Sequence, residues 1–217
     1  MVKDWVLKIR YLESVDSTQS YLKKLLLDEK ISSPYAVVSK IQTQGKGSRN
    51  NSWIGLDGNL FLSFSIPITS LPHDLKLESA SIYFAYLMKM TLENENSQVW
   101  IKWPNDFYLE EKKVGGLITN IVKESLVCGV GLNLVSSQEN FAKLDIEIST
   151  ENLLQKYFQN LEKEFSWKQV FSKYKLEFYK SKNFSTHNNN EKISLGDASL
   201  DEDGSIISNN KRMYSLR

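Results

Sequence analysis

The chain has 217 residues, of which 41% are apolar, 24% charged and 12% aromatic, which suits one principal globular domain with room for a small appendage. It carries 27 lysines and arginines against 26 aspartates and glutamates, so its formal charge is only +1. This balance argues against a protein whose main task is to coat nucleic acid, which needs a strong basic excess.

The scarcity of cysteine and histidine excludes several further kinds of site. Cys128 is the single cysteine, and the two histidines, His73 and His187, fall in or near predicted loops. These residues supply neither a disulfide framework nor a zinc cluster nor a nucleophile beside its base. Charges interrupt the first ten residues, and a run of about 18 apolar residues occurs nowhere, so we expect a cytoplasmic protein without a signal peptide or a membrane span.

The first predicted elements are a short strand at 5–12 and a helix that begins near residue 17. Asp16, Ser17 and Thr18 supply capping side chains for that helix, which we expect to end before Pro34. Its apolar face is formed by Tyr21, Leu22, Leu25 and Leu26. Strands follow at 35–41 and 60–66, and a polar loop with glycines separates them.

A long helix over 75–92 comes next, and we expect it to lie across the sheet. Four strands and two helices follow it. The strands are predicted at 99–102, 107–109, 114–122 and 126–135, the last two as a hairpin around 123–125, and the helices at 151–165 and 167–181.

The order of these elements predicts an α+β fold. We expect a central mixed, mostly antiparallel β-sheet with helices on one side, formed by residues 1–183. The composition becomes polar at 187–191, which we interpret as a linker. Residues 184–217 then form an abbreviated C-terminal β module, with strand-like pieces at 193–195, 205–208 and 212–216.

The polar loop from Gln42 to Trp53 is the first candidate for ligand binding. Two glycines bracket Lys46, and Arg49 follows, so the backbone can approach a ligand while two cations neutralise phosphate oxygens. A flexible surface loop has the same composition, so this segment alone leaves both interpretations open. The pattern is neither a Walker-type phosphate loop nor a Rossmann glycine motif.

The segment Lys102-Trp103-Pro104-Asn105-Asp106 is more specific. Pro104 has a fixed φ and restricts Trp103, so Asn105 and Asp106 are presented in a defined direction at a strand end. A carboxylate such as that of Asp106 suits Mg²⁺ shared with a nucleotide phosphate. The alternative is an ordinary Pro-Asn-Asp turn between two strands.

Two glycine-bearing strands complete the candidates. Strict alternation places Lys113 and Gly115 on one face of the strand that begins near 113, and Gly116 on the other. In the next strand, glycines at 129 and 131 share a face with Asn133, which leaves a shallow space suited to a flat ring or, alternatively, to a closely packed helix.

Taken in order, these motifs resemble the catalytic domain of the biotin protein ligases over about residues 10–135. The matching segments are Asp16-Ser17-Thr18-Gln19, the Gln42 to Trp53 loop, Gly58-Asn59-Leu60-Phe61-Leu62-Ser63, Lys102-Trp103-Pro104-Asn105-Asp106, Lys112-Lys113-Val114-Gly115-Gly116 and Gly129-Val130-Gly131-Leu132-Asn133-Leu134. The resemblance implies the class II synthetase-like fold of that family. It also implies an ATP-dependent, AMP-forming ligase that converts biotin to biotinyl-5′-adenylate with release of pyrophosphate. The biotin then passes to a lysine of the biotin carboxyl carrier protein of acetyl-CoA carboxylase.

The resemblance also implies roles for single residues. Lys113, Lys46 and Arg49 are the catalytic set, and Asp106 organises Mg²⁺. Biotin is bound by Ser17, Thr18, Gln42, Gly45, Gly115, Gly116 and Lys113. ATP and the adenylate are bound by Lys46, Arg49, Trp53, Lys102, Asn105 and Asn133.

The chain also departs from the family pattern. Many members carry Gly-Arg-Gly-Arg where this chain has Gly45-Lys46-Gly47-Ser48, so Lys46 keeps the charge without the bidentate fork of arginine. The chain begins almost at the catalytic domain, so we expect no DNA binding, and we expect a monomer or weak homodimer. The alternatives are a lipoate or octanoate ligase of the same fold and a non-catalytic biotin or nucleotide sensor.

Overall fold

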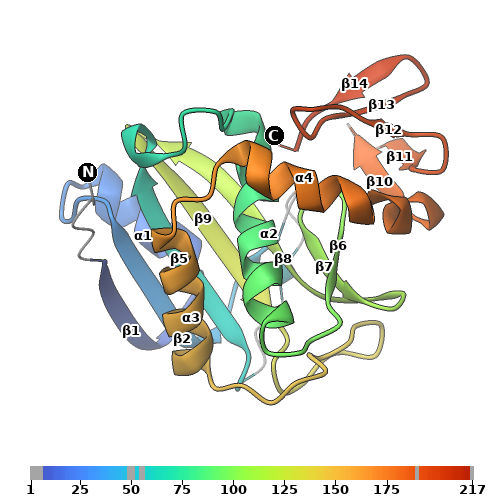
Figure 1. The fold of residues 1–217 in the computed structure, drawn as a ribbon. Helices are drawn as coiled ribbons and strands as arrows, with labels where there is room; N and C mark the ends of the chain where they lie inside the picture. Colours follow the sequence, from blue (N-terminus) through green and yellow to red (C-terminus); the bar gives the residue numbers. More distant parts are fainter. Residues whose placement is uncertain (1–6, 48–51, 54–56, 189–190, 216–217) are drawn as a thin grey trace.

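The computed structural model describes residues 7–47, 52, 53, 57–188 and 191–215. A seven-stranded mixed sheet, in the order β1-β2-β5-β9-β8-β7-β6, is its centre (Figure 1). Its strands are β1 (Lys8–Val15), β2 (Tyr35–Gln42), β5 (Leu60–Pro67), β6 (Trp100–Lys102), β7 (Asp106–Leu109), β8 (Lys112–Val122) and β9 (Ser125–Leu132). Within the described part, every helix is too short or too polar to span a lipid bilayer.

The pairing of the strands confirms the predicted mixed, mostly antiparallel sheet. Only β1 and β2 run parallel within it, because a helix connects them, and the other five neighbouring pairs are antiparallel. The predicted hairpin at 123–125 joins β8 to β9. The strand β9 ends at Leu132 rather than at 135, although the N–H of Asn133 still donates to the carbonyl of Val114 in β8.

The connecting helix α1 (Thr18–Leu27) begins at the position that its capping residues predict. Ser17 is its N-cap, and its side-chain oxygen accepts a hydrogen bond from the N–H of Ser20. Leu22 and Leu26 pack on side chains of β2, β8 and β9 in a small apolar cluster of their own. This cluster lies on the sheet face opposite to the main core, so the prediction of helices on one side only is wrong. A parallel connection between neighbouring strands must leave the sheet plane, and here it does so on the far side.

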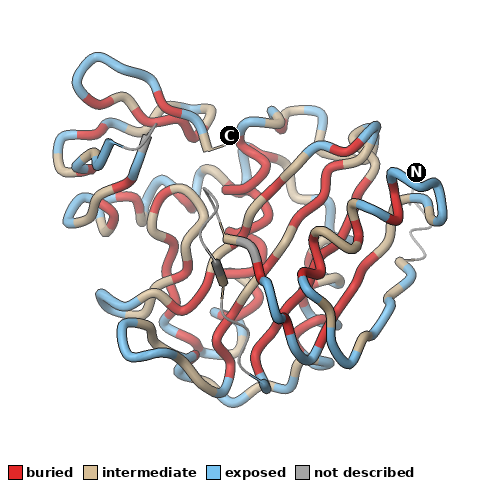
Figure 2. Tube along the Cα trace, turned by 180° about the vertical axis from the view of Figure 1, so that it is seen from behind, coloured by how far each residue is buried: buried red, intermediate tan, exposed pale blue. Residues whose placement is uncertain are grey.

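The other three helices, α2 (Ala80–Glu93), α3 (Thr150–Glu162) and α4 (Trp167–Glu177), cover the near face of the sheet in Figure 1. The predicted helix at 75–92 crosses the sheet as expected, although its first turn, Leu77–Ser79, is a 3₁₀ helix. Strand alternation explains the two faces. On β5, Leu62 and Phe64 enter the main core, whereas Ser63 between them faces the α1 side. Figure 2 shows the buried residues running along these central strands from behind.

The C-terminal part differs from the prediction at its start. The segment 187–191 is not a linker, because β10 (Ser185–Asn188) pairs antiparallel with β11 (Glu191–Ser194) across it. Three short strands follow as a second small sheet: β12 (Ser199–Leu200), β13 (Ile206–Ser208) and β14 (Lys211–Met213). Their buried side chains Ile206 and Met213 join the main core, as does Leu195, which lies between β11 and β12. The division at residue 183 stays a prediction.

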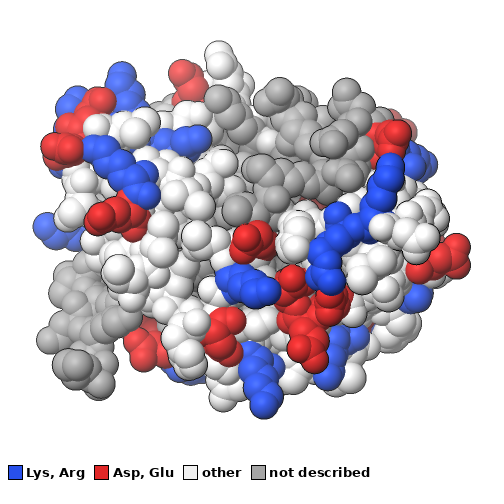
Figure 3. Space-filling model, turned by 90° about the horizontal axis from the view of Figure 1, so that it is seen from above, with Lys and Arg blue, Asp and Glu red and all other residues white. Residues whose placement is uncertain are grey.

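Charge is mixed on the molecular surface, as the composition predicts. On the face that Figure 3 draws, lysine and arginine side chains alternate with aspartate and glutamate side chains. One such cluster ties the small sheet together, with Arg212 in ion pairs to Asp201 and Asp203. Exposed pairs of this kind contribute little to stability.

Candidate ligand cavity

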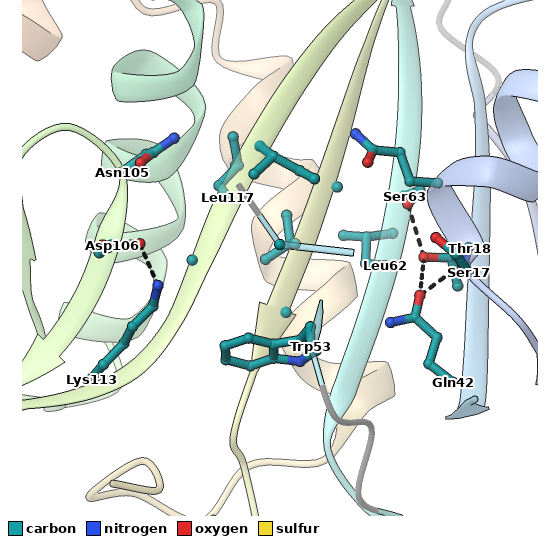
Figure 4. Close-up of a pocket in the computed structure, with 17 residues that line it drawn as sticks. Ser17, Thr18, Gln42, Trp53, Leu62, Ser63, Asn105, Asp106, Lys113 and Leu117 are labelled. Carbon is teal, nitrogen blue, oxygen red and sulfur yellow. Dashed lines mark hydrogen bonds and ion pairs between the residues drawn. The ribbon is translucent and has the colours of Figure 1, made fainter. Parts of the chain in front are cut away.

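An open cavity lies on the α1 side of the sheet, between the N-terminus of α1 and the strands β8 and β9. Its volume is about 530 Å³, counted with the solvent space at its mouth. It is lined by Ser17, Thr18, Gln19, Gln42, Gly47, Trp53, Leu62, Ser63, Asn105, Asp106, Lys113, Gly116, Leu117, Ile118, Gly129, Val130 and Gly131. Figure 4 shows polar side chains at two opposite ends, with Trp53 and Leu117 between them.

One end of the cavity, the neutral end, is formed by Thr18, Gln42 and Ser63. The Oε1 atom of Gln42 accepts hydrogen bonds from the backbone N–H of Thr18 at 2.8 Å and from its hydroxyl at 2.9 Å. A backbone N–H can only donate, so the orientation of the Gln42 amide is fixed. The single hydroxyl proton of Thr18 is used in this way, so Ser63, 2.9 Å away, must donate to Thr18. The lone pairs of Ser63 and the N–H₂ of Gln42 are thereby oriented for a ligand.

The floor between the two ends is formed by Gly129 and Gly131 of β9. A Cβ atom at position 131 would lie 2.8 Å from Nε1 of Trp53, and one at 129 would lie 3.3 Å from Cδ of Gln19. Glycine at position 131 therefore leaves the space that the indole of Trp53 occupies, and a side chain at position 129 would be in tight contact with Gln19. The two expectations for this strand both hold in part, since the glycines open the cavity and one of them also receives a helix residue.

The other end, the charged end, is formed by the lining residues Lys113 and Asp106, and Lys102, which does not line the cavity, pairs with Asp106. The Nζ atom of Lys113 lies 2.6 Å from Oδ1 of Asp106, and that of Lys102 lies 3.7 Å from Oδ2. Asn105 lies next to this cluster in Figure 4. Burial, with the nearby Asp106 charge, raises the pKa of Tyr108 to about 12, so the phenol under Lys102 stays neutral. The turn at 103–105 connects β6 to β7 through a cis peptide bond between Trp103 and Pro104, and its Asn105 lines the cavity.

A β-bulge corrects the predicted faces of β8. Phe107 pairs with Gly115 but Tyr108 pairs with Lys113, so Val114 is the extra residue. Lys113 therefore shares a face with Gly116, where a Cβ would lie 3.7 Å from Cε of Lys113, and not with Gly115 as strict alternation predicts. The bulge directs the ammonium of Lys113 into the cavity.

Position 115 requires glycine for a structural reason that the sequence does not reveal. A Cβ at this position would lie 2.2 Å from the carbonyl oxygen of Gly131, so no side chain fits between β8 and β9. It does not belong to the cavity lining, whereas Gly116 does, with its Cβ position 3.1 Å from Oδ1 of Asp106.

Trp103 links the charged end to the C-terminal part of the chain. Its side chain is fully buried, and its indole N–H donates to the carbonyl of Gly204 at 2.8 Å. Its backbone N–H donates to Oγ of Ser181, in the 3₁₀ helix Phe178–Asn183, at 3.0 Å. The turn that carries Asn105 is therefore held from two sides, both by residues far away in the sequence.

The predicted loop at 42–53 folds as two short paired strands, β3 (Gly45–Lys46) and β4 (Ser52–Trp53). A Cβ at position 45 would lie 2.3 Å from the carbonyl oxygen of Trp53, so glycine is required for this pairing. Trp53 packs edge-on against Phe141 at 5.9 Å between ring centroids. Arg49 lies outside the described residues, and the structure describes only the backbone of Lys46.

Asn133 is placed beyond the cavity lining. Its side-chain N–H₂ donates to the backbone carbonyl of Ala142 at 3.1 Å, and its backbone carbonyl oxygen accepts a hydrogen bond from the N–H of Leu144. It fastens the 133–144 segment that carries Phe141. Cys128 faces the main core, where burial raises the pKa of its thiol, which agrees with the prediction that it is no nucleophile.

Two cavity residues with polar side chains, Gln19 and Ser63, are absent from the predicted site. The helical period already places Gln19 with Leu22 and Leu26 on the inward face of α1, which is the signal that could have revealed it. Ser63 occupies the face of β5 opposite to the core leucines, and a serine there is unremarkable without knowledge of what lies above it.

Among the described lining residues, Asp106 is the one carboxylate. No group of three or more histidine, cysteine, aspartate or glutamate side chains in the described part could hold a metal ion by itself. Mg²⁺ that is bound with a nucleotide needs only one or two protein carboxylates, because phosphates and waters complete its shell. The donor set therefore fits a shared Mg²⁺ and does not fit an all-protein site.

Comparisons with known proteins agree with this arrangement. Residues 11–135 match the model of the biotin/lipoate A/B protein ligase family. The fold matches a solved biotin acetyl coenzyme A carboxylase synthetase from Helicobacter pylori, crystallised with biotinylated ATP. The two chains are 39% identical with a TM-score of 0.92, over 96% of this chain and 99% of that one. A biotin protein ligase from Aquifex aeolicus shares the fold, with a TM-score of 0.69 at 21% identity over 97% of this chain and 96% of that one.

Curated relatives match over a shorter length. The bifunctional ligase/repressor BirA of Escherichia coli is 28% identical over 135 residues, which is 58% of this chain and 40% of BirA. The human biotin–protein ligase is 27% identical over 150 residues, 64% of this chain and 20% of that protein. The match thus spans less than half of these relatives.

Proposed function

The chain belongs to the biotin/lipoate A/B protein ligase family, and on this premise we propose that it is an ATP-dependent biotin protein ligase. It activates biotin as biotinyl-5′-adenylate, with release of pyrophosphate, and transfers the biotin to a lysine of a carrier protein. The acceptor we propose is the biotin carboxyl carrier protein of acetyl-CoA carboxylase. The observation that carries this proposal is the cavity with one neutral and one cationic end.

The two ends suit the two parts of such an acid. At the neutral end, the acceptor lone pairs of Ser63 and the donor N–H₂ of Gln42 lie near each other, which fits a ring that offers both N–H and C=O groups. At the charged end, the ammonium of Lys113 can receive a carboxylate and, after activation, a phosphate. A ligand that spans the cavity therefore places its carboxylate where negative charge is neutralised.

The protein's part in the reaction is positioning and electrostatic stabilisation, since the substrates supply both the nucleophile and the electrophile. Lys113 leaves its ion pair with Asp106, 2.6 Å away, to hold the carboxylate of the acid while one carboxylate oxygen attacks the α-phosphate of ATP. We propose that Lys46 and Arg49 neutralise phosphate oxygens and that Asn105 and Lys102 contact the nucleotide. Trp53, above the floor glycine Gly131, covers the intermediate and excludes water from the reactive mixed anhydride.

Asp106 is the residue that would hold Mg²⁺, together with phosphate oxygens. The ion supplies charge neutralisation at the phosphates when it is bound. Once Lys113 turns to the substrate, the Oδ1 atom of Asp106 becomes available for this role.

The first alternative, a lipoate or octanoate ligase, is less favoured by the neutral end. A fatty or dithiolane acid offers no N–H and no ring carbonyl to Ser63 and Gln42, so their oriented polar groups would stay unpaired in a buried site. The second alternative, a non-catalytic sensor, shares the binding groups and differs only in turnover.

A direct assay tests the proposal. The protein is incubated with biotin, MgATP and an apo carrier domain, and the carrier is examined by mass spectrometry for one added biotin on one lysine. Biotin-dependent exchange between ATP and pyrophosphate is measured in parallel. Exchange with octanoate and not with biotin would establish the first alternative, and binding of biotin without any exchange would establish the second.

A further inference from the structure

A turn in the C-terminal part accepts hydrogen bonds from three distant elements of the chain. It lies at 201–205, between β12 and β13. Three successive backbone carbonyls of this turn each accept one side-chain hydrogen bond. The donors, with their acceptors and distances, are Trp167 to Glu202 at 2.9 Å, Ser79 to Asp203 at 2.6 Å and Trp103 to Gly204 at 2.8 Å. The turn therefore ties together the first residue of α4, the residue before α2 and the connection between β6 and β7.

The turn at 201–205 is itself held in one arrangement. Gly204 has a φ of +75°, which favours glycine, and a Cβ there would lie 2.7 Å from Cδ1 of Ile82. The Oδ1 atom of Asp203 accepts a hydrogen bond from the backbone N–H of Ser205 at 3.0 Å. Arg212 of β14 lies 3.4 Å from Oδ2 of the same carboxylate. The three acceptor carbonyls are therefore fixed by packing and by local hydrogen bonds.

Of the three donors, only Trp103 belongs to a segment that lines the cavity. Asn105, two positions further on, is a lining residue and is labelled in Figure 4. The backbone N–H of Trp103 donates to Oγ of Ser181 at 3.0 Å, and both residues are fully buried. On the other side of the connection, the carbonyl of Asn105 accepts from the N–H of Leu117 in β8 at 3.0 Å. Both N–H groups of Trp103 are thus bound by residues outside the sheet, and the position of Asn105 depends on them.

We propose that Ser181 and the turn at 201–205 position the nucleotide-binding side chain of Asn105 and act through Trp103. Neither is among the described residues that line the cavity. A hydrogen bond weakens steeply when it is misaligned, and a displacement of about 1 Å can cost about 10²-fold in rate. The inference rests on the proposed function for the identity of the ligand at Asn105. It adds positioning residues that control the affinity for ATP without touching it.

Two matched pairs of variants test this role. Ser181→Ala removes the acceptor of the Trp103 N–H, and Ser79→Ala removes the hydroxyl of an equally buried serine. Trp103→Phe and Trp167→Phe each remove one indole donor to the turn at 201–205. The first variant of each pair acts on the segment that lines the cavity, and the second does not. For each full-length protein, the Michaelis constant for ATP in biotin-dependent exchange is measured, together with the affinity for biotin by titration calorimetry.

The two variants of a pair should differ in their response to ATP. Ser181→Ala and Trp103→Phe are expected to raise the Michaelis constant for ATP about ten-fold, with an affinity for biotin within about two-fold of the original. Ser79→Ala and Trp167→Phe should leave both quantities within about two-fold, although each lowers the thermal unfolding midpoint because a buried hydrogen bond is lost.

The backbone amide of Leu117 reports the position of the connection without any substrate. Its N–H bonds to the carbonyl of Asn105, on the side opposite to Ser181. Hydrogen exchange at this amide, measured by NMR, should be about ten-fold faster in Ser181→Ala and Trp103→Phe than in their matched controls, because local opening exposes it.

Equal changes within each pair, in the Michaelis constant for ATP or in exchange at Leu117, would show that Ser181 and Trp103 are only structural, and would overturn the proposal. An unchanged Michaelis constant in folded Ser181→Ala would also overturn it, and this smaller substitution decides the question if Trp103→Phe does not fold. A parallel loss of affinity for biotin would show that the whole cavity is disturbed, which contradicts a role at the nucleotide end.

The positioning role and the proposed function fail in different ways. If the original protein catalyses no biotin-dependent exchange, the proposed function is wrong, and the Leu117 amide alone decides whether Ser181 and the turn at 201–205 position Asn105. If exchange occurs and the two variants of each pair behave alike, the proposed function stands and the positioning role is wrong.

Discussion

The neutral end and the charged end of the cavity differ in how their polar groups are satisfied. Thr18, Gln42 and Ser63 form a chain of hydrogen bonds whose direction is fixed by one backbone N–H, and all three are buried. Lys113 and Asp106 instead form an ion pair with side chains 27% and 23% exposed. Solvent weakens such a pair, which is worth about 0–1 kcal/mol when it is exposed. The neutral end is therefore organised before a ligand arrives, whereas the charged end must rearrange to take part in the reaction.

The largest expected effect comes from removing the cation at the charged end. Lys113→Ala should lower biotin-dependent ATP–pyrophosphate exchange by about 10²–10³-fold or more, the loss typical when one group that stabilises developing charge is removed. The side chain is partly exposed, so the fold should persist. The exposed neighbour provides the control, because Lys112→Ala should exchange normally. Near-normal exchange by a folded Lys113→Ala protein would contradict the assignment.

Substitutions of the two adjacent glycines, Gly115 and Gly116, should distinguish an effect on stability from an effect on activity at the same end. Gly115→Ala puts a Cβ 2.2 Å from a backbone oxygen of β9, so it should lower the free energy of unfolding by several kcal/mol, measured by denaturant titration. In Gly116→Ala the one contact of the new Cβ shorter than 3.7 Å is to the Asp106 carboxylate, at 3.1 Å, so this variant should keep most of the stability and weaken adenylation instead. Equal stability of the two variants would show that the bulge at Val114 is misplaced.

A smaller effect is expected at the neutral end. Thr18→Val keeps the shape but removes the hydroxyl that links Ser63 to Gln42, which leaves the Ser63 proton without its acceptor. Biotin should bind about ten-fold more weakly, with little change in the Michaelis constant for ATP. Titration calorimetry with biotin and initial rates against ATP measure the two quantities. If the Michaelis constant for ATP changed and the affinity for biotin did not, the two ends of the cavity would not be separate binding regions.

The smallest effect is the dependence on salt. Raising the ionic strength shortens the Debye length from about 10 Å at 0.1 M to about 3 Å at 1 M, which screens the partly exposed cations of the charged end. The affinity for ATP should therefore fall with added salt, while the affinity of the neutral end for a ureido ring without a carboxylate should change less than about two-fold. If added salt lowered the affinity for both ligands equally, the two ends of the cavity would not differ in the way that we propose.

The roles of Lys46 and Arg49 in closing the cavity stay predictions. Neither side chain is among those that the structure describes, although Trp53 at the end of the same segment lies over the floor of the cavity. Arg49→Ala is the variant with which to examine them, through the rate at which adenylate leaves the protein.

Local patterns in the sequence were sufficient for most of the elements. The capping residue Ser17, the apolar face of α1 and the alternation on β5 depend on residues only a few positions apart, so they could be recognised without a structure. The order of the motifs also identified the family, because Lys102 to Asp106 and its downstream glycines form a distinctive combination.

The faces, partners and contacts of these elements depend on distant pairing and were decided only by the tertiary structure. A bulge at Val114, visible only against β7, turns Lys113 toward Asp106, and the register of β5 with β9 brings Ser63 beside Gly129. Trp103 bonds to Gly204, 101 positions away. The sequence by itself thus determined most of the helices and strands and the motifs that identify the family, and its assignment of roles to single residues stays a prediction. Only the three-dimensional packing decided which of them share the cavity, because side-chain direction depends on strand register and on contacts that no local pattern encodes.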